Sequence, residues 1–146
     1  MVDLLVFENR RDFLIQFQQD LIKEFGEEDY NVFIFGSFVR DDFHDGSDID
    51  LAVYSSDSSK LVDLAYYIRK YLDKALSISH HLILIGKEAG RYIALAPLSS
   101  PWQFTDYYPE DLRAYFYTLL WDWKLHEDFR KETEWIHEYR NRRVVG

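Results

Sequence analysis

The chain has 146 residues, of which 47% are hydrophobic and 18% aromatic, so it can bury the core of one domain. It contains no cysteine, which excludes disulfides, thiolate metal sites and cysteine nucleophiles. The net charge of −9 disfavours long nucleic acids, because contacts with many phosphates normally need a basic surface. No apolar run approaches the roughly 20 residues of a membrane span and the start lacks signal-peptide order, so we expect a cytoplasmic protein without membrane contact.

The first part of the chain is predicted to form a helix followed by two strands. Apolar residues recur every three or four positions between about 9 and 25, which predicts an amphipathic helix. An apolar run predicts a strand over 31–35, and the segment 37–42 has room for one or two helical turns. After a loop over 43–46, a second apolar run predicts a strand over 49–54.

The later part of the chain adds a helix, a strand and a long final helix. A second amphipathic pattern predicts a helix over about 59–76, and the next apolar run predicts a strand over 78–85. Glycines then indicate a reversal, with a fourth strand or a short extension over 92–96. The segment 97–108 has the prolines and serines of a loop, and a helix is predicted from 109 to about 138. This order predicts an α/β (α+β) fold in which helices flank a small sheet.

The chain shows no repeat, low-complexity tract or linker that would divide it. We therefore expect a single domain over 1–146, with a core over about 9–96 and a C-terminal helical extension over about 97–146. An aromatic cluster over 102–108 has two interpretations. It can stack on a base, or it can pack against the long helix, which is the commoner use of such side chains.

The most informative stretch runs from residue 36 to 51 and reads GSFVRDDFHDGSDIDL. Gly36 and Ser37 follow a predicted strand, and backbone N–H groups at such a strand-to-helix turn can approach a phosphate closely. Asp48 and Asp50 have the i, i+2 spacing of a strand, so they point to one face and can share a divalent cation. Magnesium suits them because it prefers carboxylate oxygens, waters and substrate phosphates. A phosphate site beside a metal site indicates phosphoryl or nucleotidyl transfer.

Each part of this stretch also has an ordinary alternative. A Gly-Ser pair is more often the end of a strand followed by an N-cap serine. Two acids at strand spacing can be solvated on the open face of an edge strand, and Arg40 can be a plain surface cation. The combination at this spacing is much more specific than any part of it, so we interpret it as a nucleotide site.

The stretch resembles the signature of the DNA polymerase beta-like nucleotidyltransferases, most closely their minimal bacterial branch. That signature is a Gly-Ser pair, often a nearby Arg-Gly, and then Ser-Asp-x-Asp-Leu. The matching residues here are Gly36, Ser37, Arg40, Ser47, Asp48, Asp50 and Leu51. The glycine expected after the arginine is Asp41 in this chain. The strong match covers residues 31–54.

The resemblance implies the polymerase beta-like fold, a small mixed sheet flanked by helices with its site on adjacent strands. The resemblance implies that Gly36, Ser37, Arg40 and Ser47 bind the nucleotide. It also implies that Asp48 and Asp50 bind Mg²⁺ (or Mn²⁺). The implied reaction moves a nucleoside monophosphate from a nucleoside triphosphate to an acceptor hydroxyl. Implied acceptors are a partner protein, as when antitoxin members modify a partner toxin, or a small molecule such as an aminoglycoside. The sequence does not choose between them.

The resembled family usually carries a third carboxylate on the next core strand, and the position most like it is His81. In two-metal transfer, two ions about 3.5–4 Å apart hold the attacking and leaving oxygens. The third acid usually helps to hold the second ion or acts as a base. His81 is therefore predicted as a catalytic base or a ligand for a softer metal. The alternative is a structural pair of His80 and His81 with one imidazole on each face, and Glu88 could replace the acid in space.

Three functions are open at this stage. The first is a nucleotidyltransferase with Asp48, Asp50 and His81 as its catalytic residues. The second is a non-catalytic binding or antitoxin-like module of the same fold, which the missing third acid and Asp41 favour. The third and least supported is a glycosyltransferase, because Asp-Ile-Asp fits a metal-binding D-x-D motif while the Gly-Ser pair would be unexplained.

Overall fold

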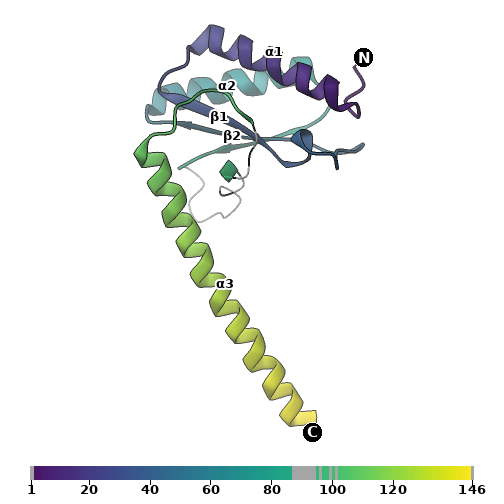
Figure 1. Cartoon of the computed structure of the whole chain (residues 1–146), viewed down its shortest axis with the longest axis vertical. Helices are drawn as coiled ribbons and strands as arrows, with labels where there is room; N and C mark the ends of the chain where they lie inside the picture. The colour runs from purple at the N-terminus through teal and green to yellow at the C-terminus, as the bar shows by residue number, and fades with distance from the viewer. Residues whose placement is uncertain (1, 87–94, 96, 99, 101, 146) are drawn as a thin grey trace.

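The computed structural model describes residues 2–86, 95, 97–98, 100 and 102–145. In chain order the elements are α1 (Phe7–Phe25), β1 (Tyr30–Phe35), the short 3-10 helix η1 (Gly36–Val39), β2 (Ile49–Ser55), α2 (Ser58–Ala75), β3 (His80–Leu84), β4 (Trp102–Gln103) and α3 (Glu110–Val145). Figure 1 shows α1 and α2 above the sheet and α3 leaving the body on the other side. The predicted order of helices and strands is confirmed as far as β3.

The four strands form one mixed sheet in the order β3-β2-β1-β4. β1 pairs antiparallel with β2, and Val32 lies opposite Val53. β2 pairs parallel with β3, and Asp50 lies opposite His81. The predicted fold, a small mixed sheet flanked by helices, is confirmed.

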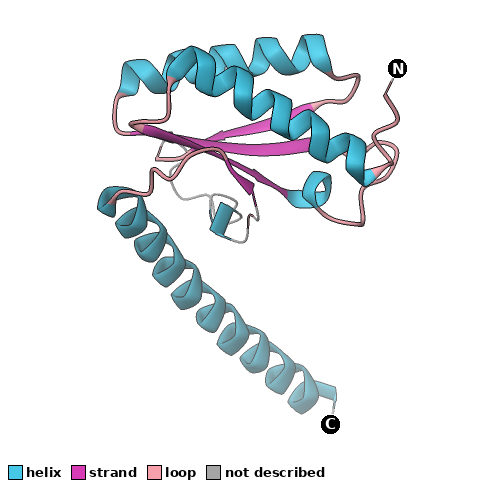
Figure 2. Ribbon diagram, turned by 45° about the horizontal axis from the view of Figure 1, so that its top comes forward, coloured by secondary structure: helices cyan, strands magenta, loops and turns pink. Residues whose placement is uncertain are grey.

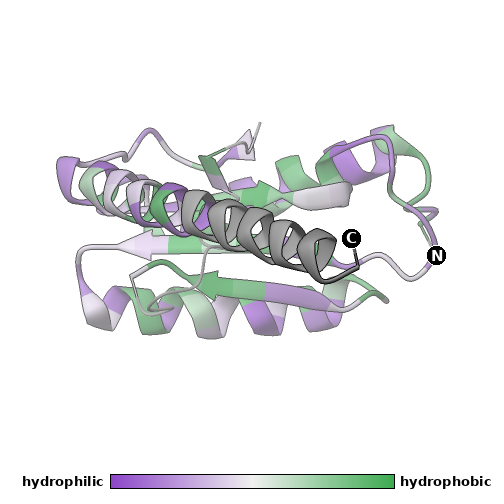
Figure 3. Cartoon of the chain, turned by 90° about the horizontal axis from the view of Figure 1, so that it is seen from below, coloured by the Kyte–Doolittle hydropathy of each residue, from purple (hydrophilic) through white to green (hydrophobic). Residues whose placement is uncertain are grey.

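Hydrophobic side chains cover both faces of the sheet. All six residues of β1 are buried, which is expected of a central strand with helices on both of its faces. Val32 and Ile34 join the core beneath α1 and α2, whereas Phe33 and Phe35 belong to a second cluster with Phe116 of α3. Figure 2 shows the resulting layers, and Figure 3, seen from below, shows α3 crossing the second face.

The final helix is 36 residues long, and it continues past the predicted end at about residue 138. In the part of the chain that the structure describes, no helix is both long and apolar enough to cross a bilayer.

The prediction of an uninterrupted loop over 97–108 was wrong at two residues. Trp102 and Gln103 form β4 and lie opposite Ile34 and Phe33 of β1. A two-residue strand has no period that a sequence could display, and this one is held by long-range hydrogen bonds to β1. The strand predicted over 92–96 lies outside the described residues, apart from Leu95.

Candidate functional site

The two halves of the motif meet at one end of the sheet. Phe35, the last residue of β1, lies opposite Asp50 of β2, and Gly36 follows at once. Gly36 has φ 76°, and a Cβ there would overlap Oδ2 of Asp50 and lie 3.3 Å from its Cγ. A glycine is required at this position because any side chain would collide with that carboxylate and would also strain the backbone. The turn therefore brings its own backbone directly against an acid of the motif.

Asp48 and Asp50 enter the site from the start of β2. Asp48 lies immediately before the strand, is exposed, and accepts a hydrogen bond from the hydroxyl of Ser79. Asp50 is more enclosed, with 29% of its side chain exposed. It shares the alternating face of β2 with Ala52, which belongs to the cluster beneath α3. The acids thus lie at the edge of the sheet face that α3 covers farther along.

His81 lies beside Asp50 because β2 and β3 run parallel in register. Its Nδ1 is 3.7 Å from Oδ1 of Asp50, and about half of its side chain is exposed. His80 points to the other face, where its Nδ1 lies 3.8 Å from Oδ1 of Asp73 on α2. The structure therefore gives one imidazole to each face and brings His81 to the acids, while its chemical role stays a prediction.

Asp50 has an electrostatic environment that opposes its ionisation. Burial is the largest effect and raises the pKa of the Asp50 carboxyl, and the nearby Asp48 raises it further. His81 and Arg40 act in the opposite direction, although not enough to reverse the shift. A cation bound here would remove this penalty, because it favours the charged carboxylate.

Arg40 and Ser47 are engaged within their own loop. Arg40 Nε donates to Oδ1 of Asp42 at 3.0 Å, and this hydrogen bond lowers the pKa of Asp42. Both side chains are mostly exposed, so little free energy opposes the release of Arg40 toward another anion. Ser47 Oγ accepts from the backbone N–H of His44 at 3.1 Å, and Ser47 N–H donates to the His44 carbonyl. Ser47 therefore closes the turn that leads into Asp48.

Asp48 and Asp50 supply donor atoms of the kind that bind a divalent ion. Among the described residues, no three His, Asp or Glu side chains are grouped so as to hold a metal ion. Magnesium is commonly bound through one or two carboxylates together with waters and substrate phosphates. Asp48 and Asp50 match that donor set, so they could hold an ion that arrives with a triphosphate. Glu88, the predicted substitute for the third acid, lies outside the described residues.

The aromatic residues of 102–108 have partners within the protein. Phe104 is buried edge-on against Phe17 of α1, with ring centroids 5.2 Å apart. Tyr107 stacks on Tyr54, and Tyr108 stacks on Phe116. These contacts favour the packing interpretation over a base-stacking wall.

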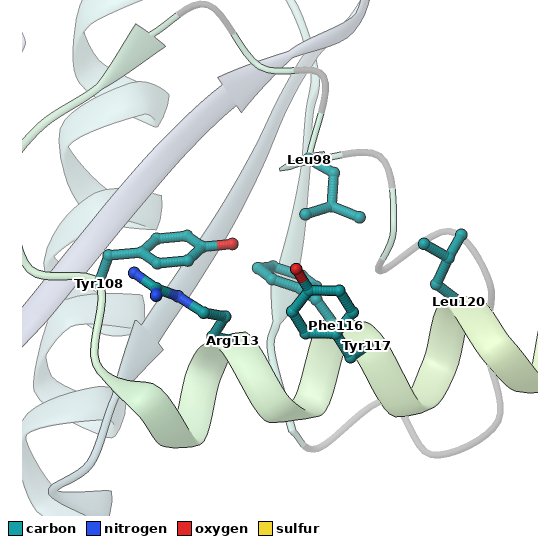
Figure 4. A pocket seen from close by; sticks show the side chains of 6 residues that line it. All are labelled: Leu98, Tyr108, Arg113, Phe116, Tyr117 and Leu120. Atoms are coloured by element: carbon teal, nitrogen blue, oxygen red, sulfur yellow. The ribbon is translucent and has the colours of Figure 1, made fainter.

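A cavity of about 380 Å³ lies on the same side of the sheet, between α3 and the segment before β4. Figure 4 shows its lining, which is Leu98, Tyr108, Arg113, Phe116, Tyr117 and Leu120. None of these residues belongs to the motif, so the cavity is separate from the site formed by the acids.

Sequence reasoning missed two residues that donate hydrogen bonds to the motif segment. Ser79 gave no signal, because its bond to Asp48 joins segments 31 positions apart. Arg10 did give a signal in the sequence. It continues the buried stripe of Leu14, Phe17 and Leu21 on α1, and yet it is charged. A charge on the apolar side of an amphipathic helix indicates a buried polar function.

Comparison with known proteins identifies the family. The model of the nucleotidyltransferase domain family matches residues 14–93, which is more than half of the chain. The chain belongs to the nucleotidyltransferase domain family. This membership leaves the glycosyltransferase alternative without support, since the matched segment includes both the Gly-Ser turn and the paired acids.

Two solved structures share the nucleotidyltransferase fold with this chain. One is a mutant of the toxin–antitoxin MntA-HpeT in which two aspartates are replaced by glutamate, at 15% identity and a TM-score of 0.51. The other is a toxin–antitoxin with AMP-PNP, at 17% identity and a TM-score of 0.50. Each alignment covers 79% of this chain and 90% of the other. No match was found among curated proteins.

Proposed function

We propose that this nucleotidyltransferase domain moves a nucleoside monophosphate from a nucleoside triphosphate to the hydroxyl of a partner protein or a small molecule. The observation that supports this most directly is the contact between the Gly36 turn and Asp50, with Asp48 and His81 alongside. In this proposal Gly36 and Ser37 contact phosphate oxygens. Arg40 and Ser47 complete the nucleotide site, as the sequence resemblance implies.

The proposed reaction is an in-line displacement at the α-phosphorus. The acceptor oxygen forms a bond to that phosphorus, the bond to the bridging oxygen breaks, and pyrophosphate leaves. His81 is in a position to take the proton from the acceptor hydroxyl, because its ring reaches Asp50 and remains half exposed. Asp48 and Asp50 would hold Mg²⁺ (or Mn²⁺), which when bound neutralises charge on the triphosphate.

A non-catalytic binding or antitoxin-like module is the second candidate. Two observations favour it: no group of three described side chains is placed to hold a metal ion, and the two similar structures named above are of toxin–antitoxin proteins. In that case the same residues would bind a nucleotide, and the chain would act by holding a partner protein.

Turnover separates the two candidates. The protein would be incubated with each labelled triphosphate in Mg²⁺ or Mn²⁺, and released pyrophosphate and labelled protein would be measured. The transferase proposal predicts metal-dependent pyrophosphate release that the Asp50→Asn variant lacks. A protein that binds triphosphate but never releases pyrophosphate, with or without a partner, would support the binding module.

The His81→Asp variant then assigns the role of the histidine. If the site lacks charge at a second metal position, the new carboxylate raises turnover. If His81 is the base, turnover falls and the pH–rate profile loses the limb that an imidazole base contributes. Turnover that responds to neither pH nor this substitution would remove His81 from the catalytic residues.

A further inference from the structure

Arg10 of α1 is a buried cation held by main-chain carbonyls. Only 2% of the residue is exposed. Nε donates to the carbonyl of Phe38 at 2.9 Å, Nη1 to that of Leu4 at 2.6 Å, and Nη2 to that of Arg40 at 2.9 Å. Its Cζ also lies 4.7 Å from the centroid of the Phe43 ring. One guanidinium therefore contacts η1, the residue after it and the following loop.

Burying this cation costs free energy of folding that an apolar side chain would not cost. A charged side chain in an apolar core loses its hydration, and hydrogen bonds to neutral carbonyls restore only part of that free energy. Leucine at this position of α1 would continue the apolar stripe at no such cost. A guanidinium differs from every other side chain in presenting five donors in a rigid planar fork, so it can fix several carbonyls at once.

Two of the three carbonyls that Arg10 holds, those of Phe38 and Arg40, lie directly after the proposed Gly36-Ser37 phosphate turn. In a trans peptide the carbonyl and the N–H point in opposite directions. By holding the carbonyls of Phe38 and Arg40, Arg10 fixes the directions of the N–H groups of Val39 and Asp41. Arg10 also contacts Phe43, which lies in the loop that leads to the acids.

We propose that Arg10 is a positioning residue for the triphosphate site. It touches no substrate, and it acts by fixing the backbone from Gly36 to Asp41 in the shape that receives phosphate. This inference rests on the proposed function, because it assigns the turn to the triphosphate. It goes further by placing part of the binding affinity on a helix that contributes no ligand.

The test compares Arg10→Lys and Arg10→Met with the unaltered protein. Lysine keeps the charge, but its single ammonium cannot span the three carbonyls, whereas methionine removes every donor at similar length. Affinity for AMP-PNP with Mg²⁺ would be measured by calorimetry, and amide exchange of residues 36–42 by mass spectrometry. Both variants should bind about tenfold or more weakly, with faster exchange in 36–42.

Ile68→Val is the matched control for a general loss of stability. Ile68 is fully buried in the same core but lies on α2, and the change should cost about 0.5–1.5 kcal/mol. It should leave AMP-PNP affinity within about twofold of the unaltered protein. If Arg10→Met fails to fold, Arg10→Lys decides the question, since it retains the charge and the stem.

Three outcomes would overturn the proposal, and they differ from one another. If the unaltered protein binds AMP-PNP and a folded Arg10→Lys variant binds it equally well, the positioning role is wrong and the triphosphate site stands. If the unaltered protein binds no triphosphate in Mg²⁺ or Mn²⁺, both proposals fall. An affinity loss in Ile68→Val equal to that in Arg10→Lys would also reduce Arg10 to a structural residue.

Discussion

Gly36 and Asp50 occupy adjoining space, so each constrains what the other can be. The carboxylate lies where a side chain at position 36 would begin, and the backbone at 36 is left-handed. Glycine is therefore required at position 36 for two separate reasons, the positive φ of the backbone and the contact with Asp50. Only the contact involves the site.

Gly36→Ala is predicted to separate these two effects when it is compared with Gly26→Ala. Both glycines have nearly equal positive φ, 76° and 77°, but a Cβ at Gly26 meets nothing within 4 Å. Each change should cost about 1–3 kcal/mol of stability through backbone strain. Only Gly36→Ala should displace Asp50 and weaken Mg²⁺-triphosphate binding by about tenfold or more, measured by calorimetry. Equal affinities in the two variants would show that Gly36 has no role in the site.

Asp50 is predicted to reduce stability when it is ionised and no metal is bound. Its folded pKa is raised, chiefly by burial, so the folded state holds the proton more tightly than the unfolded chain does. Stability must then fall as the pH rises through the raised pKa, and the ionised carboxylate carries the full penalty above it. Asp50→Asn should therefore raise the melting temperature in EDTA at pH 7, and this gain should vanish as the pH falls past the ordinary aspartate value of 3.8.

Asp63→Asn is the control for this measurement. Asp63 is exposed on α2, so its replacement removes the same charge from the acidic protein without relieving a buried carboxylate. If the two variants gain equal stability at pH 7, the effect comes from net charge and not from the environment of Asp50.

At the scale of elements, Asn31 joins β1 to the segment that leads into α3. Its side chain is fully buried and donates to the carbonyl of Tyr107 at 2.9 Å. Its Oδ1 accepts from the backbone N–H of Thr105 at 3.1 Å and from that of Val32 at 2.9 Å. One carboxamide thus satisfies the backbone of a segment that has little regular structure of its own.

Asn31→Ala is predicted to lower the free energy of unfolding by about 1–3 kcal/mol, because it leaves buried donors and acceptors without partners. Denaturant titration measures this loss. Asn9→Ala is the comparison, since its side chain also donates to a carbonyl, that of Asp3, but in an exposed position. The Asn9 variant should lose much less, and a similar loss in both would contradict the role given to Asn31.

These elements show what the sequence could and could not predict. α1, β1, β2 and α2 follow from local periodicity, because each buries one stripe or one strand run. The approach of Asp48, Asp50 and His81 was predictable from the alternation of strand residues and the resemblance.

The remaining features depend on pairs that are far apart in the chain. β4 forms because Trp102 and Gln103 pair with Ile34 and Phe33 of β1. The residues around β4 carry no sequence pattern that predicts this pairing. The bond from Ser79 to Asp48 needs the register of β2 and β3, which no short window contains. The carbonyls bound by Arg10 are backbone atoms, so their residue types carry no trace of the contact.

At the scale of the whole molecule, the site and the start of the long helix lie toward opposite ends of the sheet. The acids stand at the start of β2, and Tyr107, just before α3, stacks on Tyr54 near its end. Figure 1 shows α3 leaving from that end. A protein with a net charge of −9 repels a free triphosphate, so we expect binding to depend on a divalent ion that screens both partners.

The measurement that tests the nucleotide site most directly is calorimetric titration of triphosphates in Mg²⁺ and in EDTA. The unaltered protein would be compared with the double variant Asp48→Asn, Asp50→Asn, with its fold checked by thermal unfolding. The account predicts binding that requires Mg²⁺ and that the folded double variant loses by about a hundredfold or more. Equal binding by the two proteins, or binding that persists unchanged in EDTA, would contradict the assignment of Asp48 and Asp50 as metal ligands.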